Sequence, residues 1–174
     1  FDLVLDTQPV ADVTIALSSS NLAEGTISPS SVTFTASNWN VPQTVSVTGV
    51  DDAVQDGDQA FTILTAAATS GDFVYDAMDA ADISVSNSDD DAAGISVSPL
   101  TGLVVSEAGS TATFSVVLTS EPTADVTIPV ASNDAGEGVA SPSSITFTAL
   151  NWNMAQTVTV TGADDMVQDG DQAF

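Results

Sequence analysis

Residues 111–119, Thr-Ala-Thr-Phe-Ser-Val-Val-Leu-Thr, carry an apolar side chain at every second position and are rich in β-branched residues. Because successive side chains of a strand point to opposite faces, this alternation predicts a strand with one buried face. The same reading predicts further strands, separated by turn-forming residues, at 60–67, 82–87, 95–98, 102–106, 124–131, 144–149 and 156–161.

The spacing of these segments indicates the fold class. About seven short strands in about 110 residues, with turns between them, are typical of an immunoglobulin-like antiparallel β-sandwich. No segment has a convincing helical period, and the content of Ser, Thr and Val disfavours helices. The chain is acidic, yet 43% of its residues are hydrophobic and its mean hydropathy is +0.24. We therefore predict an all-β protein with no helices of note, and not a disordered chain.

An internal repeat sets the domain organisation. Asn38-Trp39-Asn40 recurs as Asn151-Trp152-Asn153, an offset of 113 residues, and at this offset nearly two thirds of the overlapping positions are identical without a gap. Such a period predicts a tandem array of sandwiches. The densest turn-like stretch, residues 88–94, predicts the boundary between two partial units. We expect residues 1–93 to form a repeat without its first strands and residues 94–174 a repeat without its last strands, both parts of a longer protein.

The composition excludes several classes of function. The 174 residues include 24 Asp and Glu but no Lys, Arg, His or Cys, giving a formal charge of −24. Binding to nucleic acids or to anionic membrane surfaces depends on basic side chains, so we expect neither kind of partner. Without His, Cys or Lys, a serine or thiolate nucleophile has no partner and thiolate metal sites cannot form. No apolar run approaches the length of a membrane span, so we expect no direct membrane insertion. We also expect no enzymatic activity, because the carboxylates lie in turns and no groove for a substrate is visible in the sequence.

The carboxylates are concentrated in loops that a sandwich brings to one end. Most of them lie in the loop that precedes the strand at 60–67 in the first unit and follows the strand at 156–161 in the second unit. Others lie in the turn before the strand at 111–119, in the loop after the strand at 124–131, and after the strand at 82–87. In the first unit, Asn21 and Glu24 occupy the equivalent of the loop after 124–131. The predicted metal ligands are Asp51, Asp52, Asp56, Asp58, Asp89, Asp90, Asp91, Glu107, Asp134, Asp164, Asp165, Asp169 and Asp171.

Grouped carboxylates in a chain without cationic side chains indicate a bound cation. Ca²⁺ takes six to eight oxygen ligands, whereas Mg²⁺ keeps several waters and the missing His and Cys disfavour transition metals. An isolated Asp56-Gly57-Asp58 is also typical of a solvated tight turn. The spacing does not match the helix–loop–helix calcium motif, because Thr62 occupies the twelfth position counted from Asp51.

These residues together resemble the Calx-β domain. The segment Val105-Ser106-Glu107-Ala108-Gly109 is similar to an early motif of that family, residues 45–61 and 158–174 are similar to its Val-x-Val-x-x-x-Asp-Asp segment, and Asp89-Asp90-Asp91 is similar to its closing acidic run. The resemblance implies a sandwich with calcium ligands at Glu107, Asp51, Asp52, Asp56 and Asp89 to Asp91, repeated at Asp164, Asp165 and Asp169. The sequence departs from the family at Gln59 and Gln172, where a Glu is common, and it lacks the family's Asp-Tyr pair.

The leading hypothesis is a structural one. We expect a segment of a long extracellular or cell-surface protein, adhesive or filamentous, in which Ca²⁺ at the acidic end and at the linker stiffens the contact with neighbouring repeats. The alternative is a glycan-binding module of a larger adhesin or secreted enzyme, in which Trp39 and Trp152 stack on sugars. A third hypothesis is self-assembly, in which identical chains complete each other's open sheet edges by strand addition.

Overall fold

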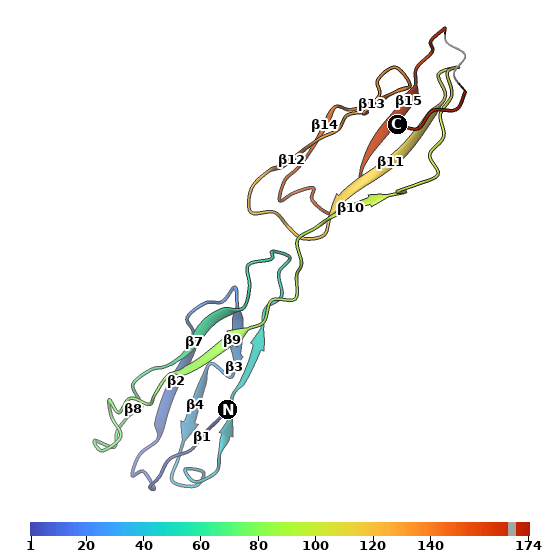
Figure 1. Ribbon diagram of the computed structural model, residues 1–174. Helices are drawn as coiled ribbons and strands as arrows, with labels where there is room; N and C mark the ends of the chain where they lie inside the picture. The colour runs from blue at the N-terminus through green and yellow to red at the C-terminus, as the bar shows by residue number, and fades with distance from the viewer. Residues whose placement is uncertain (167–169) are drawn as a thin grey trace. The chain divides into compact units, whose positions relative to one another are not determined.

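The computed structural model describes residues 1–166 and 170–174, and within them the chain is all-β, as predicted. It divides into two compact units (Figure 1). The first unit comprises Phe1–Asp52 and Asp56–Asp89, and the second comprises Ala53–Gln55 and Asp90–Phe174. No helix among the described residues is long and apolar enough to cross a bilayer.

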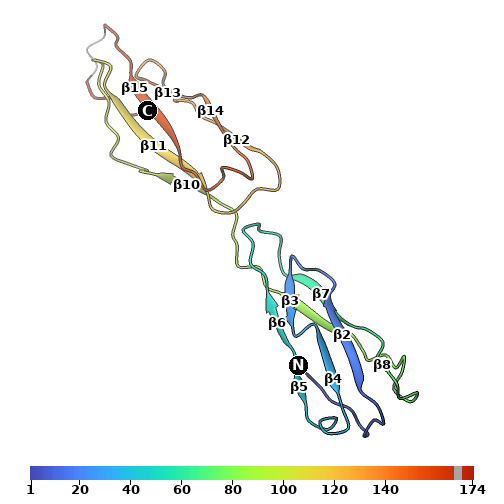
Figure 2. The same ribbon diagram turned by 180° about the vertical axis from the view of Figure 1, so that it is seen from behind.

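The first unit contains nine short strands, and Figure 2 shows them from behind. They are β1 (Asp2–Leu3), β2 (Val13–Ser19), β3 (Gly25–Ser28), β4 (Ser31–Phe34), β5 (Gln43–Thr44), β6 (Ser46–Gly49), β7 (Gln59–Thr65), β8 (Thr69–Ser70) and β9 (Ile83–Asn87). One sheet has the order β4-β2-β7-β9, with β8 also paired to β2, and the pairs β1-β5 and β3-β6 stand apart from it. Every pairing is antiparallel.

The second unit repeats part of this arrangement. Its strands are β10 (Ile95–Ser98), β11 (Thr111–Leu118), β12 (Val126–Pro129), β13 (Gly138–Ser141), β14 (Ser144–Phe147) and β15 (Gln156–Gly162). They form an antiparallel four-stranded sheet, β10-β11-β15-β13, and an antiparallel pair, β12-β14.

The core of the first unit lies between its sheets. Val13, Ile15 and Leu17 of β2 pack with Phe34 of β4, and Leu3 of β1 and Ile27 of β3 pack against them from the other strand pairs. In the second unit, Val116 and Leu118 of β11 meet Ile145 and Phe147 of β14. Packing of one sheet's inward face on another's is consistent with a β-sandwich.

Two details differ from the sequence-based strands. Residues 102–106 form no strand, no described strand pairs with them, and Val104 within them is 80% exposed. Conversely, β3 and β13 occupy positions where the sequence predicts only a loop. In their sequences, Gly-Thr-Ile-Ser and Gly-Val-Ala-Ser, apolar and polar side chains alternate too weakly to indicate strands. These strands form by pairing with β6 and β15.

Candidate metal site

Strand register brings the acidic loops of the first unit to one end. Gly25 at the start of β3 lies opposite Gly49 at the end of β6, and Gln59 at the start of β7 lies opposite Asn87 at the end of β9. The loop before β3, the β6–β7 loop and the segment after β9 must therefore meet. We call residues 20–24, 50–52, 56–58 and 88–89 the acidic end of the first unit.

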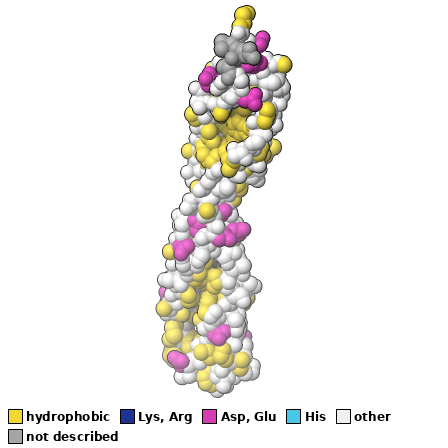
Figure 3. All heavy atoms as spheres, turned by 45° about the vertical axis from the view of Figure 1, so that its right-hand side comes forward, with side chains coloured by type: hydrophobic (Ala, Val, Ile, Leu, Met, Phe, Trp, Pro, Cys, Tyr) yellow, Lys and Arg dark blue, Asp and Glu magenta, His cyan; other side chains and the backbone are white. Residues whose placement is uncertain are grey.

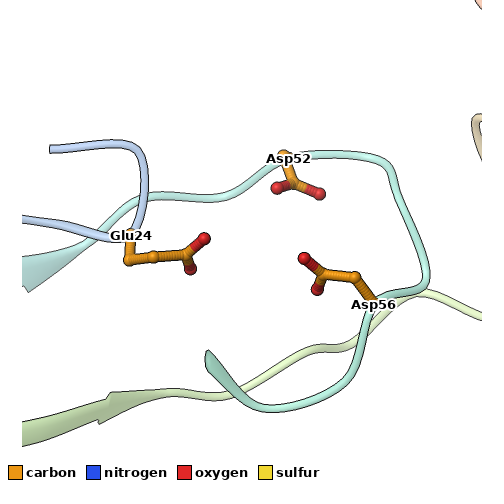
Figure 4. Close-up of side chains that lie close together, drawn as sticks. All are labelled: Glu24, Asp52 and Asp56. Carbon is orange, nitrogen blue, oxygen red and sulfur yellow. The ribbon is translucent and has the colours of Figure 1, made fainter. Parts of the chain in front are cut away.

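Three carboxylates of the acidic end face one another. Glu24, Asp52 and Asp56 each offer an oxygen atom, and these atoms all lie within 4.8 Å of one another. Figure 4 shows the three side chains converging on a common space. Glu24 directly precedes β3, and the two aspartates lie in the segment between β6 and β7. This acidic group could hold a metal ion.

Glu24 differs from its two partners in burial. Its side chain is only 9% exposed, whereas Asp52 and Asp56 are exposed. The Asn87 amide donates to Glu24 Oε2 at 3.3 Å and to the Val50 carbonyl at 2.7 Å, and the Val50 N–H donates to the Glu24 carbonyl at 3.0 Å. A buried carboxylate needs compensation for its lost hydration. The chain has no Lys, Arg or His to supply a charge, so a counter-cation must come from solution.

Asp58 and Asp89 accept hydrogen bonds from the backbone at the same end. The Gly57 N–H donates to Asp89 Oδ2 at 2.6 Å, and the Asp89 N–H donates to Asp58 Oδ1 at 3.1 Å. Gly57 has a φ of +78°, a conformation that favours glycine. These two hydrogen bonds tie the tip of the β6–β7 loop, next to Asp56, to the segment that follows β9.

The second unit brings equivalent segments together. Gly138 at the start of β13 lies opposite Gly162 at the end of β15, and the Ala163 N–H donates to the Glu137 carbonyl at 2.9 Å. The Gly162 N–H donates to the Ser110 carbonyl at 3.1 Å, directly after the turn that carries Glu107. The loops bearing Glu107, Glu137 and Asp164 therefore meet at one end, as predicted. Within the described part of this unit, however, no three carboxylates come as close together as in the acidic group.

The remaining predicted ligands fall into three sets. Asp164, Asp165 and Asp171 are exposed, and Asp169 lies outside the described residues. Asp134 Oδ1 accepts from the Gly136 N–H at 2.9 Å, and Asn21 Oδ1 accepts from the Ala23 N–H in the first unit. Because a neutral Asn shapes the same turn, the charge of Asp134 is not needed for it. Asp51 belongs to the first unit and Asp90 and Asp91 to the second.

Glu24 is the one member of the acidic group that is absent from the metal ligands predicted from the sequence, although it lies in the predicted acidic loop. The repeat offers a signal: Glu24 and Glu137 are separated by 113 residues, and each is followed by the glycine that starts a strand.

The two tryptophans serve as turn residues in this structure. The Trp39 carbonyl accepts from the Leu5 N–H at 3.0 Å, and the Trp152 carbonyl accepts from the Leu118 N–H at 3.1 Å. Both side chains are half-buried, and the Trp152 ring packs against the core of the second unit. The backbone of both tryptophans therefore takes part in turns, and sugar stacking by their half-buried rings stays a prediction.

A comparison of the chain with known protein families, with curated proteins and with solved structures finds no match.

Proposed function

We propose that this chain is a structural segment of an extracellular or cell-surface array and that Ca²⁺ bound by Glu24, Asp52 and Asp56 stabilises its first unit. The observation that carries the proposal is the acidic group itself. A nearly buried carboxylate faces two others within 4.8 Å, in a chain without a single basic side chain.

The physical argument for a cation is the repulsion that it would remove. Two like charges about 4 Å apart repel by about 1 kcal/mol in water and about 4 kcal/mol at the effective dielectric constant of a protein surface. Solvent and salt reduce this repulsion at the exposed Asp52 and Asp56 and have less access to Glu24. A divalent ion among the three would turn the repulsion into attraction.

The chemistry of the ligands favours Ca²⁺ over other metals. All three side chains supply hard oxygen atoms, and neither His nor Cys is present in the chain. Ca²⁺ accepts mono- or bidentate carboxylates in irregular geometry at 2.3–2.6 Å, whereas Mg²⁺ demands a near-ideal octahedron and keeps several waters. Three carboxylates on two separate loops fit the less demanding ion.

A weak site of this kind suits an extracellular protein. Extracellular calcium modules have Kd values of about 10⁻⁴ to 10⁻³ M, near the calcium concentration that surrounds them. A ligand that binds only the folded state stabilises it by about 2.7 kcal/mol at 100 times its Kd. Calcium would then act as a structural component of the first unit.

Thermal unfolding tests the proposal. The melting temperature of the whole chain is measured in Ca²⁺, in Mg²⁺ and in excess chelator, at one ionic strength. We expect Ca²⁺ to raise the melting temperature by several degrees and Mg²⁺ to raise it by less. A melting temperature that is the same in Ca²⁺ and in chelator overturns the proposal, and an equal effect of both ions overturns the choice of Ca²⁺.

A further inference from the structure

Asn87 lies beside the acidic group and comes from a different strand than its members. It is the last residue of β9, where it pairs with Gln59 at the start of β7. Its half-buried side-chain amide donates two hydrogen bonds, to Glu24 Oε2 at 3.3 Å and to the Val50 carbonyl at 2.7 Å. One acceptor is therefore a member of the acidic group, and the other lies two residues before Asp52.

These two hydrogen bonds join the two segments that carry the acidic group. Glu24 precedes β3, whereas Val50 follows β6 and leads to Asp52. The backbone also links the two segments, because the Val50 N–H donates to the Glu24 carbonyl at 3.0 Å. That backbone bond fixes the course of the segments. The Asn87 amide adds a contact to the carboxylate itself, so it sets the direction of the Glu24 side chain.

An amide is a suitable donor to a carboxylate that is also to bind a metal ion. Glu24 is 9% exposed, so protein groups must replace part of its hydration. The chain has no Lys, Arg or His, and Figure 3 accordingly shows only carboxylates among the charged side chains of the displayed face. The Asn side chain offers two N–H donors without a positive charge. It therefore compensates Glu24 in part and leaves its negative charge for a cation.

Gly49 leaves the space that the Asn87 amide occupies. A β-carbon at position 49, the last residue of β6, would overlap Asn87 Oδ1. The φ of Gly49 does not lie in the left-handed region, so the backbone at this position does not itself require glycine. The steric requirement at position 49 comes from the Asn87 side chain.

We propose that Asn87 is a positioning residue of the metal site, whose amide holds the Glu24 carboxylate toward the two aspartates and engages one of its oxygen atoms. This inference rests on the proposed calcium function. Groups that hydrogen-bond a metal ligand orient it, and their loss typically costs about 10- to 100-fold in metal affinity. Without an ion the three carboxylates repel one another. A Glu24 side chain that has lost the amide would turn away from the aspartates, and calcium binding would have to reverse that movement.

Asn87→Leu tests the amide, because leucine keeps the branched shape of the side chain and forms no hydrogen bonds. Calorimetric titration of the whole chain with Ca²⁺ is carried out at a temperature at which circular dichroism shows each variant to be folded. We expect Ca²⁺ to bind the variant about tenfold more weakly than the unmodified chain.

Asn38→Ala is the matched control. Asn38 lies between β4 and β5, and its side chain accepts from the Thr35 N–H and donates to the Thr33 carbonyl. Losing these hydrogen bonds should lower the melting temperature in chelator and leave the calcium affinity unchanged. If Asn38→Ala weakens calcium binding as far as Asn87→Leu does, the loss follows from general destabilisation and the positioning role is overturned.

The titrations separate this inference from the function on which it rests. If the unmodified chain binds Ca²⁺ and Asn87→Leu binds it equally well, the positioning role is overturned and the calcium site stands. If the unmodified chain binds no Ca²⁺, both are overturned.

Gly49→Ala reaches the same contact while keeping Asn87, and it provides the test if Asn87→Leu does not fold. The added methyl group should displace the amide and weaken calcium binding several-fold. Asn87→Ala makes room for the methyl group, so adding Gly49→Ala to Asn87→Ala should cost no further affinity. An equal loss from Gly49→Ala with and without the Asn87 side chain overturns the proposal.

Discussion

The aromatic ring of Phe61 lies against Gly25 so closely that a β-carbon at position 25 would overlap the ring. Phe61 belongs to β7 and Gly25 to β3, so this contact fixes the start of one strand on the start of the other. Glu24 directly precedes the glycine, and the loop with Asp56 directly precedes β7. The contact therefore positions both sides of the acidic group. The same relationship recurs between Phe174 and Gly138 in the second unit.

Replacing Gly25 by Ala should destabilise the first unit by about 1–3 kcal/mol, because the new methyl group forces the buried Phe61 ring to move. Chemical denaturation followed by circular dichroism measures the effect. Phe61→Leu in the same chain makes room for the methyl group, so the double variant should lose less than the sum of the two single variants. Strictly additive losses would show that the ring and the glycine do not constrain each other.

Part of this arrangement could be predicted from the sequence. The alternation of large apolar side chains predicts the ends of β11 and β7 to within two residues. β3 and β13 could not be, since a strand of small residues depends on its partner and not on its own side chains. The site shows the same division. The convergence of the acidic loops follows from the order of the strands. The burial of Glu24 could not be predicted in this way, because its neighbour Gly25 lies against Phe61, which is distant in the sequence.

Glu24→Gln should have effects of opposite sign with and without calcium. In chelator the variant should be more stable than the unmodified chain by about 1 kcal/mol, because one of three mutually repelling charges is gone. In Ca²⁺ it should be less stable, because a ligand is lost. Melting curves of both proteins in both conditions measure the crossover.

Asp12→Asn is the matched control for this charge. Asp12 directly precedes β2 at the opposite end of the strand from Ser19, and Val13 beside it pairs with Phe34. Removing its charge should shift the melting temperature by the same small amount in Ca²⁺ and in chelator. If Asp12→Asn reproduces the crossover, the effect belongs to net charge and not to the acidic group.

Substitutions of Asp89 separate a structural hydrogen bond from a metal ligand. Asp89→Asn keeps an oxygen that can accept from the Gly57 N–H, whereas Asp89→Ala removes it. If the hydrogen bond is the task of this side chain, the Ala variant should exchange the Gly57 amide hydrogen about tenfold faster, and the Asn variant should stay close to the unmodified chain. Calorimetric titration with Ca²⁺ gives the second readout. A calcium affinity that falls as far with Asn as with Ala would identify Asp89 as a ligand.

Tyr75→Phe should destabilise the first unit without touching the acidic end. The Tyr75 side chain is 6% exposed, its hydroxyl donates to the Thr7 carbonyl at 2.7 Å, and the Thr7 N–H donates back to it at 3.2 Å. Losing this hydroxyl should lower the free energy of unfolding by about 1 kcal/mol, at the low end of the range for an unpaired group because Thr7 is exposed and water can replace the partner. The calcium-dependent shift in melting temperature should be unchanged, and a loss of that shift would mean that the two ends of the first unit are coupled.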